Sequence, residues 1–231
     1  MTALTLFMGL SAIVASLNPC TLAVIIMSVS SLLGKGKHPR HAGVHTLMFA
    51  FGTFVAYSLL AFAWRYLLLA LPIGLVGYIG IVLSVFIVLF GLLEIKDYFW
   101  YGKGLSFKLS ARSETKIHAW TKKHHSHFRG FLLGIYTAFR LSHYTVILVL
   151  ASTLLLSVLD PTSVLAIFSW ATWYVAPLIM IAMLLMFGVN AYSLTTWKEQ
   201  TKHNMRLSVG VIYILIGWVI LTVLAGGLKL V

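Results

Sequence analysis

The pentapeptide Asn18-Pro19-Cys20-Thr21-Leu22 holds residues whose types and spacing could do chemistry, and it lies within a long apolar stretch. Proline removes a backbone N–H donor and clashes with the preceding turn. A membrane helix broken at Pro19 therefore leaves carbonyl groups that must face protein or water instead of lipid. The thiol of Cys20, beside that break, could be reached by a partner and act in catalysis. The plainer interpretation is a proline kink with a small buried cysteine that packs as a hydrophobic residue.

A second polar feature, Arg140 followed by His143, interrupts another apolar stretch. An isolated cation inside a membrane span costs about 2.5 kcal/mol or more on insertion scales, so Arg140 should face the helix bundle, a cavity or an anionic partner. His143 lies three positions later and would share its helical face, and the pair could bind an anion, a lipid carboxylate or a partner subunit. Alternatively, Arg140 reaches the cytoplasmic interface from a helix that starts later than the apolar stretch suggests.

Histidines gather before this stretch, at His118, His124, His125 and His127. Imidazoles bind zinc, copper or nickel, which makes the last three of these residues candidate metal ligands. Their spacing is not that of a helical ligand pair, and no carboxylate or cysteine lies close by in the sequence. A hydrated basic loop near anionic lipid headgroups is the more common explanation of such a cluster, and metal binding stays open.

The composition decides which elements must position these residues. The chain has 231 residues, of which 60% are hydrophobic and 10% are charged, with a mean hydropathy of +0.97. A soluble domain carries about 25% charged residues, so this chain has too little ionic surface for a soluble globule and must use the bilayer as its solvent. A single cysteine excludes an internal disulfide, a four-cysteine zinc site and an intramolecular dithiol.

Six stretches are long and apolar enough to cross the ~30 Å hydrocarbon core as helices. They are residues 4–33, 44–71, 73–93, 131–159, 163–188 and 207–230. The predicted fold class is an all-α polytopic membrane protein with six transmembrane helices in a single membrane domain, residues 1–231. A first three-helix unit occupies residues 1–93, a basic cytoplasmic loop residues 94–129, and a second three-helix unit residues 130–231.

The net charge of +12 is distributed as the positive-inside rule requires. Lys and Arg are concentrated in the loops after the first, third and fifth spans, so we expect these loops to face the cytoplasm. Both termini would then lie on the outer side of the membrane, which we expect to be the cytoplasmic (inner) membrane. Arg65, near the outer end of the second span, is the exception and should extend to the interface. Because the rule accounts for the charge, the expected partner is the lipid bilayer and not nucleic acid. The start of the chain lacks the basic segment of a cleavable signal peptide.

Three motifs together point to a known family. They are the pentapeptide at residues 18–22 in the first span, the segment 94–104 that opens the central loop, and residues 174–179 around a proline in the fifth span. With these motifs the chain resembles, over nearly its whole length, the CcdA family of cytochrome c biogenesis proteins. That family is related to the membrane domain of the DsbD thiol reductases and, distantly, to the LysE superfamily.

The resemblance implies two inverted three-helix repeats that carry electrons from cytoplasmic thioredoxin to extracytoplasmic thiol proteins. It also implies two working cysteines, one in an Asn-Pro-Cys motif, which maps onto residues 18–20, and one in the fourth helix. The fourth span of this chain has no cysteine, and the counterpart position falls on Ser142, His143 or Tyr144. Two-electron exchange needs two sulfurs, so such a carrier would depend on a partner's thiol. We expect the first span to be broken near Pro19 and the fourth near Ser142, close together near the bilayer midplane.

Two other functions remain open. A redox-inactive descendant could serve as a membrane subunit or assembly factor of a larger complex, with Arg140 and His143 making contacts in place of thiol exchange. A metal-ion exporter is the third candidate, disfavoured because no Asp or Glu lies inside any of the six predicted spans. The expected protein partner is a thioredoxin-like protein or a membrane complex. If the chain is an enzyme, it is a thiol-disulfide oxidoreductase, and no cofactor is expected.

Overall fold

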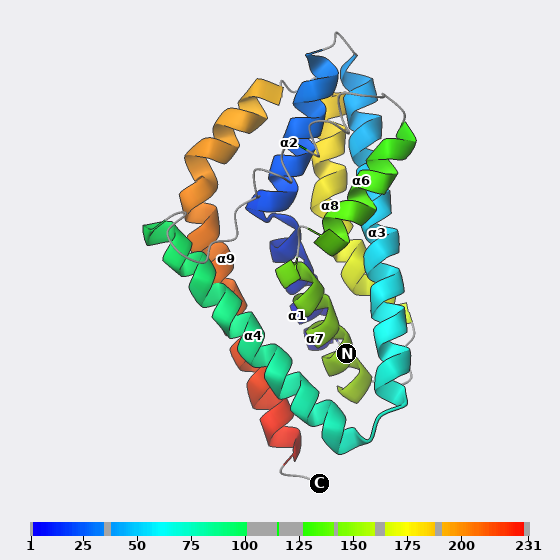
Figure 1. Ribbon diagram of the computed structural model, residues 1–231, viewed down its shortest axis with the longest axis vertical. Helices are drawn as coiled ribbons and strands as arrows, with labels where there is room; N and C mark the ends of the chain where they lie inside the picture. Colours follow the sequence, from blue (N-terminus) through cyan, green and yellow to red (C-terminus); the bar gives the residue numbers. More distant parts are fainter. Residues whose placement is uncertain are drawn as a thin grey trace.

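The computed structural model describes residues 2–34, 38–100, 115, 127–140, 143–159, 165–187 and 191–228. These residues form eight helices and no strand. The helices are α1 (Thr2–Ser16), α2 (Pro19–Leu33), α3 (Pro39–Leu69), α4 (Ile73–Phe99), α6 (His127–Arg140), α7 (His143–Leu159), α8 (Leu165–Met186) and α9 (Ala191–Leu228) (Figure 1). The predicted all-α class is confirmed.

Helix α4 shows why the chain belongs in a membrane. Its buried face is made largely of small side chains, such as Gly80, Ser84 and Gly91. Its exposed face carries Leu75, Tyr78, Val82, Val85, Phe86, Leu89 and Leu92. Water would penalise this arrangement, whereas lipid solvates large apolar side chains and leaves small residues to bring helices together.

Two bent helix pairs, each a broken span or a re-entrant loop, occupy the places of the first and fourth predicted spans. Four helices are long and apolar enough to cross a membrane alone, and two bent pairs bring the number of spans to as many as six. Helices α1 and α2 meet at an angle of 50°, and helices α6 and α7 meet at 77°. The chain is therefore a multi-pass membrane protein, and the first and fourth predicted spans are both broken. Leu141 and Ser142, between α6 and α7, lie outside the described residues.

Contacts between the two halves of the chain come in matching pairs. Helix α3 packs against α6 as α8 packs against α1, and α4 contacts α7 as α9 contacts α2. Helices α3 and α8 contact each other, as do α4 and α9. In Figure 1, α4 and α9 lie side by side and are antiparallel. Two inverted three-helix units, which the resemblance implies, would give this pattern of contacts.

Glycines set the two closest helix pairs. A methyl group on Gly134 of α6 would overlap the carbonyl of Phe49 on α3, and one on Gly91 of α4 would lie 2.7 Å from the carbonyl oxygen of Gly210 on α9. Small residues in these positions let the backbones touch, and that dispersion contact holds helices together where lipid removes the hydrophobic driving force.

Several helices extend beyond the predicted spans. Helix α4 continues past residue 93 to Phe99, and α9 begins at Ala191, so most of the loop expected between the fifth and sixth predicted spans, residues 191–206, is helical. Neither extension contains Pro or Gly. A fall in hydropathy therefore marks the edge of the hydrocarbon core there and not the end of the helix. Arg65 was also placed wrongly: it is 5% exposed and buried among the helices instead of extending outwards.

Candidate functional site

The break in the first span is made by Asn18 and Pro19. Proline suits the first position of α2 because its missing N–H is not needed there. Asn18 caps α2, because its side-chain oxygen Oδ1 accepts a hydrogen bond from the backbone N–H of Cys20 at 2.7 Å. Asn18 itself is 1% exposed. The break is thus a capped helix start inside the bundle, at the position predicted from the sequence.

Cys20 lies in the first turn of α2 and is 8% exposed. The N-terminus of a helix favours negative charge, so this position suits a thiolate electrostatically. The next residue, Thr21, shares a hydrogen bond with the hydroxyl of Tyr174 on α8, with an oxygen–oxygen distance of 3.4 Å. The thiol is therefore well placed for exchange chemistry but covered, and a partner can reach it only if the helices move.

Three buried aromatic side chains form one wall beside the break. Tyr57 of α3 meets Tyr174 and Trp170 of α8 edge to face, with ring centroids 4.8 and 5.7 Å apart, and the two α8 rings stack at 5.5 Å. The indole N–H of Trp170 donates a hydrogen bond to the hydroxyl of Ser11 on α1 at 3.1 Å. These contacts tie α1, α3 and α8 together, so this side of the break is a packed core.

The break in the fourth span differs in its chemistry. Helix α6 ends at Arg140 and α7 begins at His143. The shared helical face expected for these two residues is therefore wrong, because they belong to different helices that meet at 77°. The side chains of His143 and Tyr144, like all of Ser142, lie outside the described part of the structure.

The starts of α2 and α7 suggest how the two halves correspond. Thr21 is the third residue of α2 and Thr145 is the third residue of α7, and both are fully buried. Counting from these helix starts, Tyr144 takes the place of Cys20. Among the three counterpart candidates, this register favours Tyr144.

The Arg140 side chain is exposed at the end of α6. Of the three surroundings expected for this cation, the interior of the bundle is therefore excluded. The described residues neither pair with its guanidinium nor enclose it. A cavity or an anionic partner remains of the surroundings expected for Arg140.

A buried group of charges, which we call the ion cluster, was not predicted from the sequence. It consists of Glu94, Lys96 and Asp97 on α4 and Arg206 on α9. Nη1 of Arg206 donates hydrogen bonds to Oδ2 of Asp97 at 2.8 Å and to Oε2 of Glu94 at 3.2 Å. Nζ of Lys96 lies 2.9 Å from Oδ1 of Asp97. The cluster joins the third helix of one half to the third helix of the other.

Helix geometry explains the ion cluster. Glu94 and Asp97 are three residues apart and share a face of α4. Gly91 meets Gly210 one turn away, and because α4 and α9 are antiparallel, Arg206 then lies opposite the two carboxylates. The six predicted spans do lack acidic residues, but Glu94 and Asp97 follow the third of them directly, on the part of α4 that continues beyond residue 93, and both are buried there. The sequence signal was the pair of acids at the end of a span in a chain with only five Asp and Glu residues.

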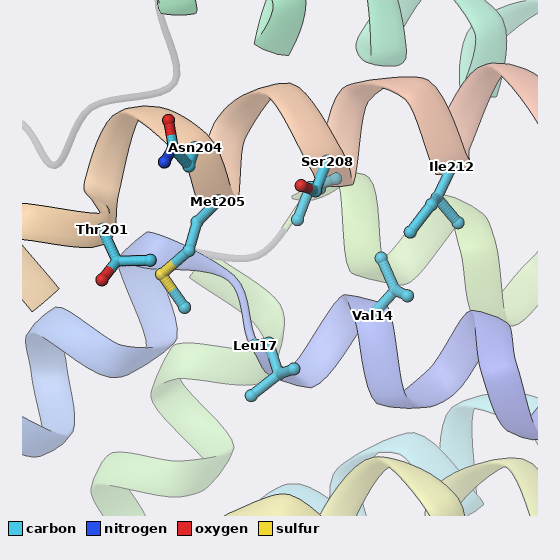
Figure 2. Close-up of a pocket in the computed structure, with 8 residues that line it drawn as sticks. Val14, Leu17, Thr201, Asn204, Met205, Ser208 and Ile212 are labelled. Carbon is cyan, nitrogen blue, oxygen red and sulfur yellow. The ribbon is translucent and has the colours of Figure 1, made fainter.

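The opposite face of α9 lines a cleft of about 190 Å³ (Figure 2). Val14 of α1 and Leu17, which follows α1, form one wall, and Asn204, Met205 and Ser208 of α9 lie on the other. Leu17 directly precedes the capping residue Asn18. The cleft therefore adjoins the break in the first span, and the α9 segment that forms its wall is the one fastened to α4 by Arg206.

The metal prediction falls largely outside the described residues. His124 and His125 lie there entirely, and so does the side chain of His127. In the part of the chain that the structure describes, no three His, Cys, Asp or Glu side chains are grouped so that they could hold a metal ion.

Comparison with known proteins gives no relative from which a role could be transferred. No family model, no curated protein and no solved structure matches this chain.

Proposed function

We propose that the protein is a membrane thiol carrier of the CcdA type, in which Cys20 exchanges disulfides with thioredoxin-like partners. One observation carries the proposal: the only thiol of the chain lies at a capped helix start inside a broken membrane span. A broken helix is tolerated within a bundle where its backbone serves a binding or transport site. The basic loops would face the cytoplasm, with both termini outside in the inner membrane.

The exchange balances with one thiol only if each partner brings two sulfurs. The Cys20 thiolate attacks the disulfide of an extracytoplasmic protein, forming a mixed disulfide and releasing one thiolate of that protein. A thiolate of a cytoplasmic dithiol protein then attacks the sulfur of Cys20, which releases the second thiolate of the first protein. The second thiol of the donor closes the donor's own disulfide and frees Cys20. Two electrons thus pass from donor to acceptor, and protons from water complete the thiols.

The first step can be tested with a trapped partner. A thioredoxin-like protein with its second active-site cysteine changed to serine is activated as a mixed disulfide with thionitrobenzoate and mixed with the full chain in detergent. The Cys20 thiolate should displace thionitrobenzoate, which absorbs at its own wavelength, and leave an interprotein disulfide that accumulates because no second sulfur resolves it. The Cys20→Ser variant should give neither signal.

A small maleimide and an unrelated activated protein are the matched controls for access. If Cys20 reacts with the maleimide but forms the thioredoxin adduct no faster than the adduct with the unrelated protein, the carrier proposal fails.

The ion cluster favours one other candidate, a carrier of a small ion. The exporter was disfavoured because the predicted spans lack carboxylates, and Glu94 and Asp97 weaken that objection by burying two carboxylates on α4 just past the third predicted span. Transport into vesicles separates the two proposals. In the Cys20→Ser variant, a thiol carrier no longer transfers reducing equivalents, whereas an ion carrier still transports its ion.

A further inference from the structure

Arg140 lies near the middle of the molecule and not at its edge. Helix α6 is 14 residues long, so it descends about 21 Å at 1.5 Å per residue, which exceeds half of the ~30 Å hydrocarbon core. In Figure 1, α6 begins in the upper part of the molecule and ends near its middle, at about the level where α1 gives way to α2. A guanidinium at this depth keeps its charge, because arginine does not lose its proton in proteins.

The surface around Arg140 is apolar. Phe128, Leu132 and Phe139 are 62%, 39% and 47% exposed. At spacings of four and seven residues, these side chains form one stripe along α6. Gly130 and Gly134 bring the other side of the helix against α3, so the stripe faces away from the bundle. A cation at the end of an apolar stripe, without a described partner, is unstable in lipid.

The sequence assigns none of the chain's acidic residues to the middle of a predicted span. It contains five in all: Glu94, Asp97, Glu114, Asp160 and Glu199. The first two are buried against Arg206. Glu114 belongs to the central loop, Asp160 follows the last residue of α7, and Glu199 precedes the apolar part of α9, which begins at Asn204. By sequence, a second copy of the chain therefore brings no acidic residue to mid-span for Arg140.

We propose that the α6 stripe, formed by Phe128, Leu132 and Phe139 with the adjacent Arg140 at its end, binds a transmembrane helix of a different protein that carries a carboxylate near the middle of the bilayer. The stripe supplies the apolar contact, and the guanidinium binds the carboxylate through two parallel hydrogen bonds. The flat, apolar stripe favours a helix over a small hydrated anion, and the described cleft lies elsewhere, between α1 and α9. This inference does not depend on thiol chemistry at Cys20.

A designed partner tests this surface directly. The probe is a polyleucine transmembrane peptide with one central Asp, and the control peptide has Leu at that position. Energy transfer between labelled protein and labelled peptide is measured in phosphatidylcholine vesicles. The Asp peptide should associate about tenfold more tightly than the Leu peptide, and Arg140→Leu should abolish the difference. Arg40→Leu, which removes an exposed arginine at the start of α3, should leave it unchanged.

Charge reversal makes the test specific. The Arg140→Glu variant should no longer prefer the Asp peptide over the Leu peptide, and it should bind a peptide with a central Lys more tightly than the Leu peptide. Equal binding of the Asp and Leu peptides by the wild-type chain would overturn the proposal. So would Arg140-dependent association between two copies of the chain, or much tighter binding of the Asp peptide by Glu114→Gln, because the occupant of Arg140 would then be the chain itself.

The depth of the stripe provides a second measurement if an Arg140 variant fails to fold. Phe139→Cys in a Cys20→Ser chain is labelled with a fluorophore and quenched by lipids that carry a quencher at known depths. Quenching should be strongest from the acyl-chain position. Strongest quenching from the headgroup, or displacement of the Asp peptide by anionic phosphatidylglycerol, would show that Arg140 binds lipid phosphate and that the proposal is wrong.

Discussion

The break at Asn18 and the ion cluster at Arg206 both place polar groups inside an apolar bundle, but they satisfy these groups in opposite ways. Asn18 bonds to a backbone N–H two residues away, within one span. Arg206 bonds to carboxylates more than 100 positions earlier in the chain, across the two halves. The first region is neutral and locally determined, whereas the second is charged and exists only after folding. Their difference suggests a division of roles, in which the break serves chemistry and the ion cluster fixes α9 against α4.

The largest expected effect is the loss of stability when the cation of the ion cluster, Arg206, is removed. Arg206→Leu leaves Glu94 without a cation and Asp97 with Lys96 alone, and removing one partner of a buried ion pair costs about 3–5 kcal/mol. Unfolding in mixed micelles should report this loss. The combined Glu94→Leu, Asp97→Leu and Arg206→Leu variant should recover much of it, because no fully buried charge remains, and Lys96, which loses Asp97, is 27% exposed and can turn to water. A triple variant as unstable as Arg206→Leu would mean that the cluster acts through its hydrogen bonds and not through charge balance.

A smaller effect is expected from the glycine contact that positions the ion cluster. A methyl group on Gly210 would lie 2.7 Å from Cγ1 of Ile95 and 2.8 Å from the carbonyl oxygen of Gly91. Gly210→Ala should push α9 away from α4 and lower the free energy of unfolding by about 1–3 kcal/mol. Gly226→Ala is the matched control on the same helix, since nothing lies within 4 Å of its added methyl. Equal stability of the two variants would show that α4 and α9 are not held by close contact.

The sequence was a good guide to what depends on local chemistry. Apolar length predicted the spans and Pro19 predicted the first break, because both signals lie within a few turns of one helix. The break between Arg140 and His143 carries no proline and was expected only through a family resemblance. The sequence spacing could not show which side chains pack beside the first break, such as Tyr57 of α3 against Tyr174 of α8.

The ion cluster shows why the rest escaped prediction. Hydropathy ended the third span before Glu94 and began the sixth after Arg206, so all of its charges were assigned to loops. Helices continue beyond the hydrocarbon core wherever no Pro or Gly stops them. Pairing Arg206 with Asp97 also requires that α4 and α9 be neighbours and antiparallel, and that information lies in the packing of the two halves and not in either segment.

The smallest effect is expected at the break itself, where the interaction is local. Asn18→Ala removes the acceptor for the buried N–H of Cys20, and loss of a helix cap costs about 0.5–2 kcal/mol. A loss of about 1 kcal/mol raises the population of locally opened α2 about fivefold, so Cys20 should react about fivefold faster with a maleimide in membrane vesicles. Asn18→Ser should react at nearly the wild-type rate, because serine also caps helices. Ser30→Ala, at an exposed site on the same helix, controls for substitution in α2. Unchanged labelling in Asn18→Ala would mean that the cap does not cover the thiol, and the contrast between a chemically poised break and a structural ion cluster would lose its basis.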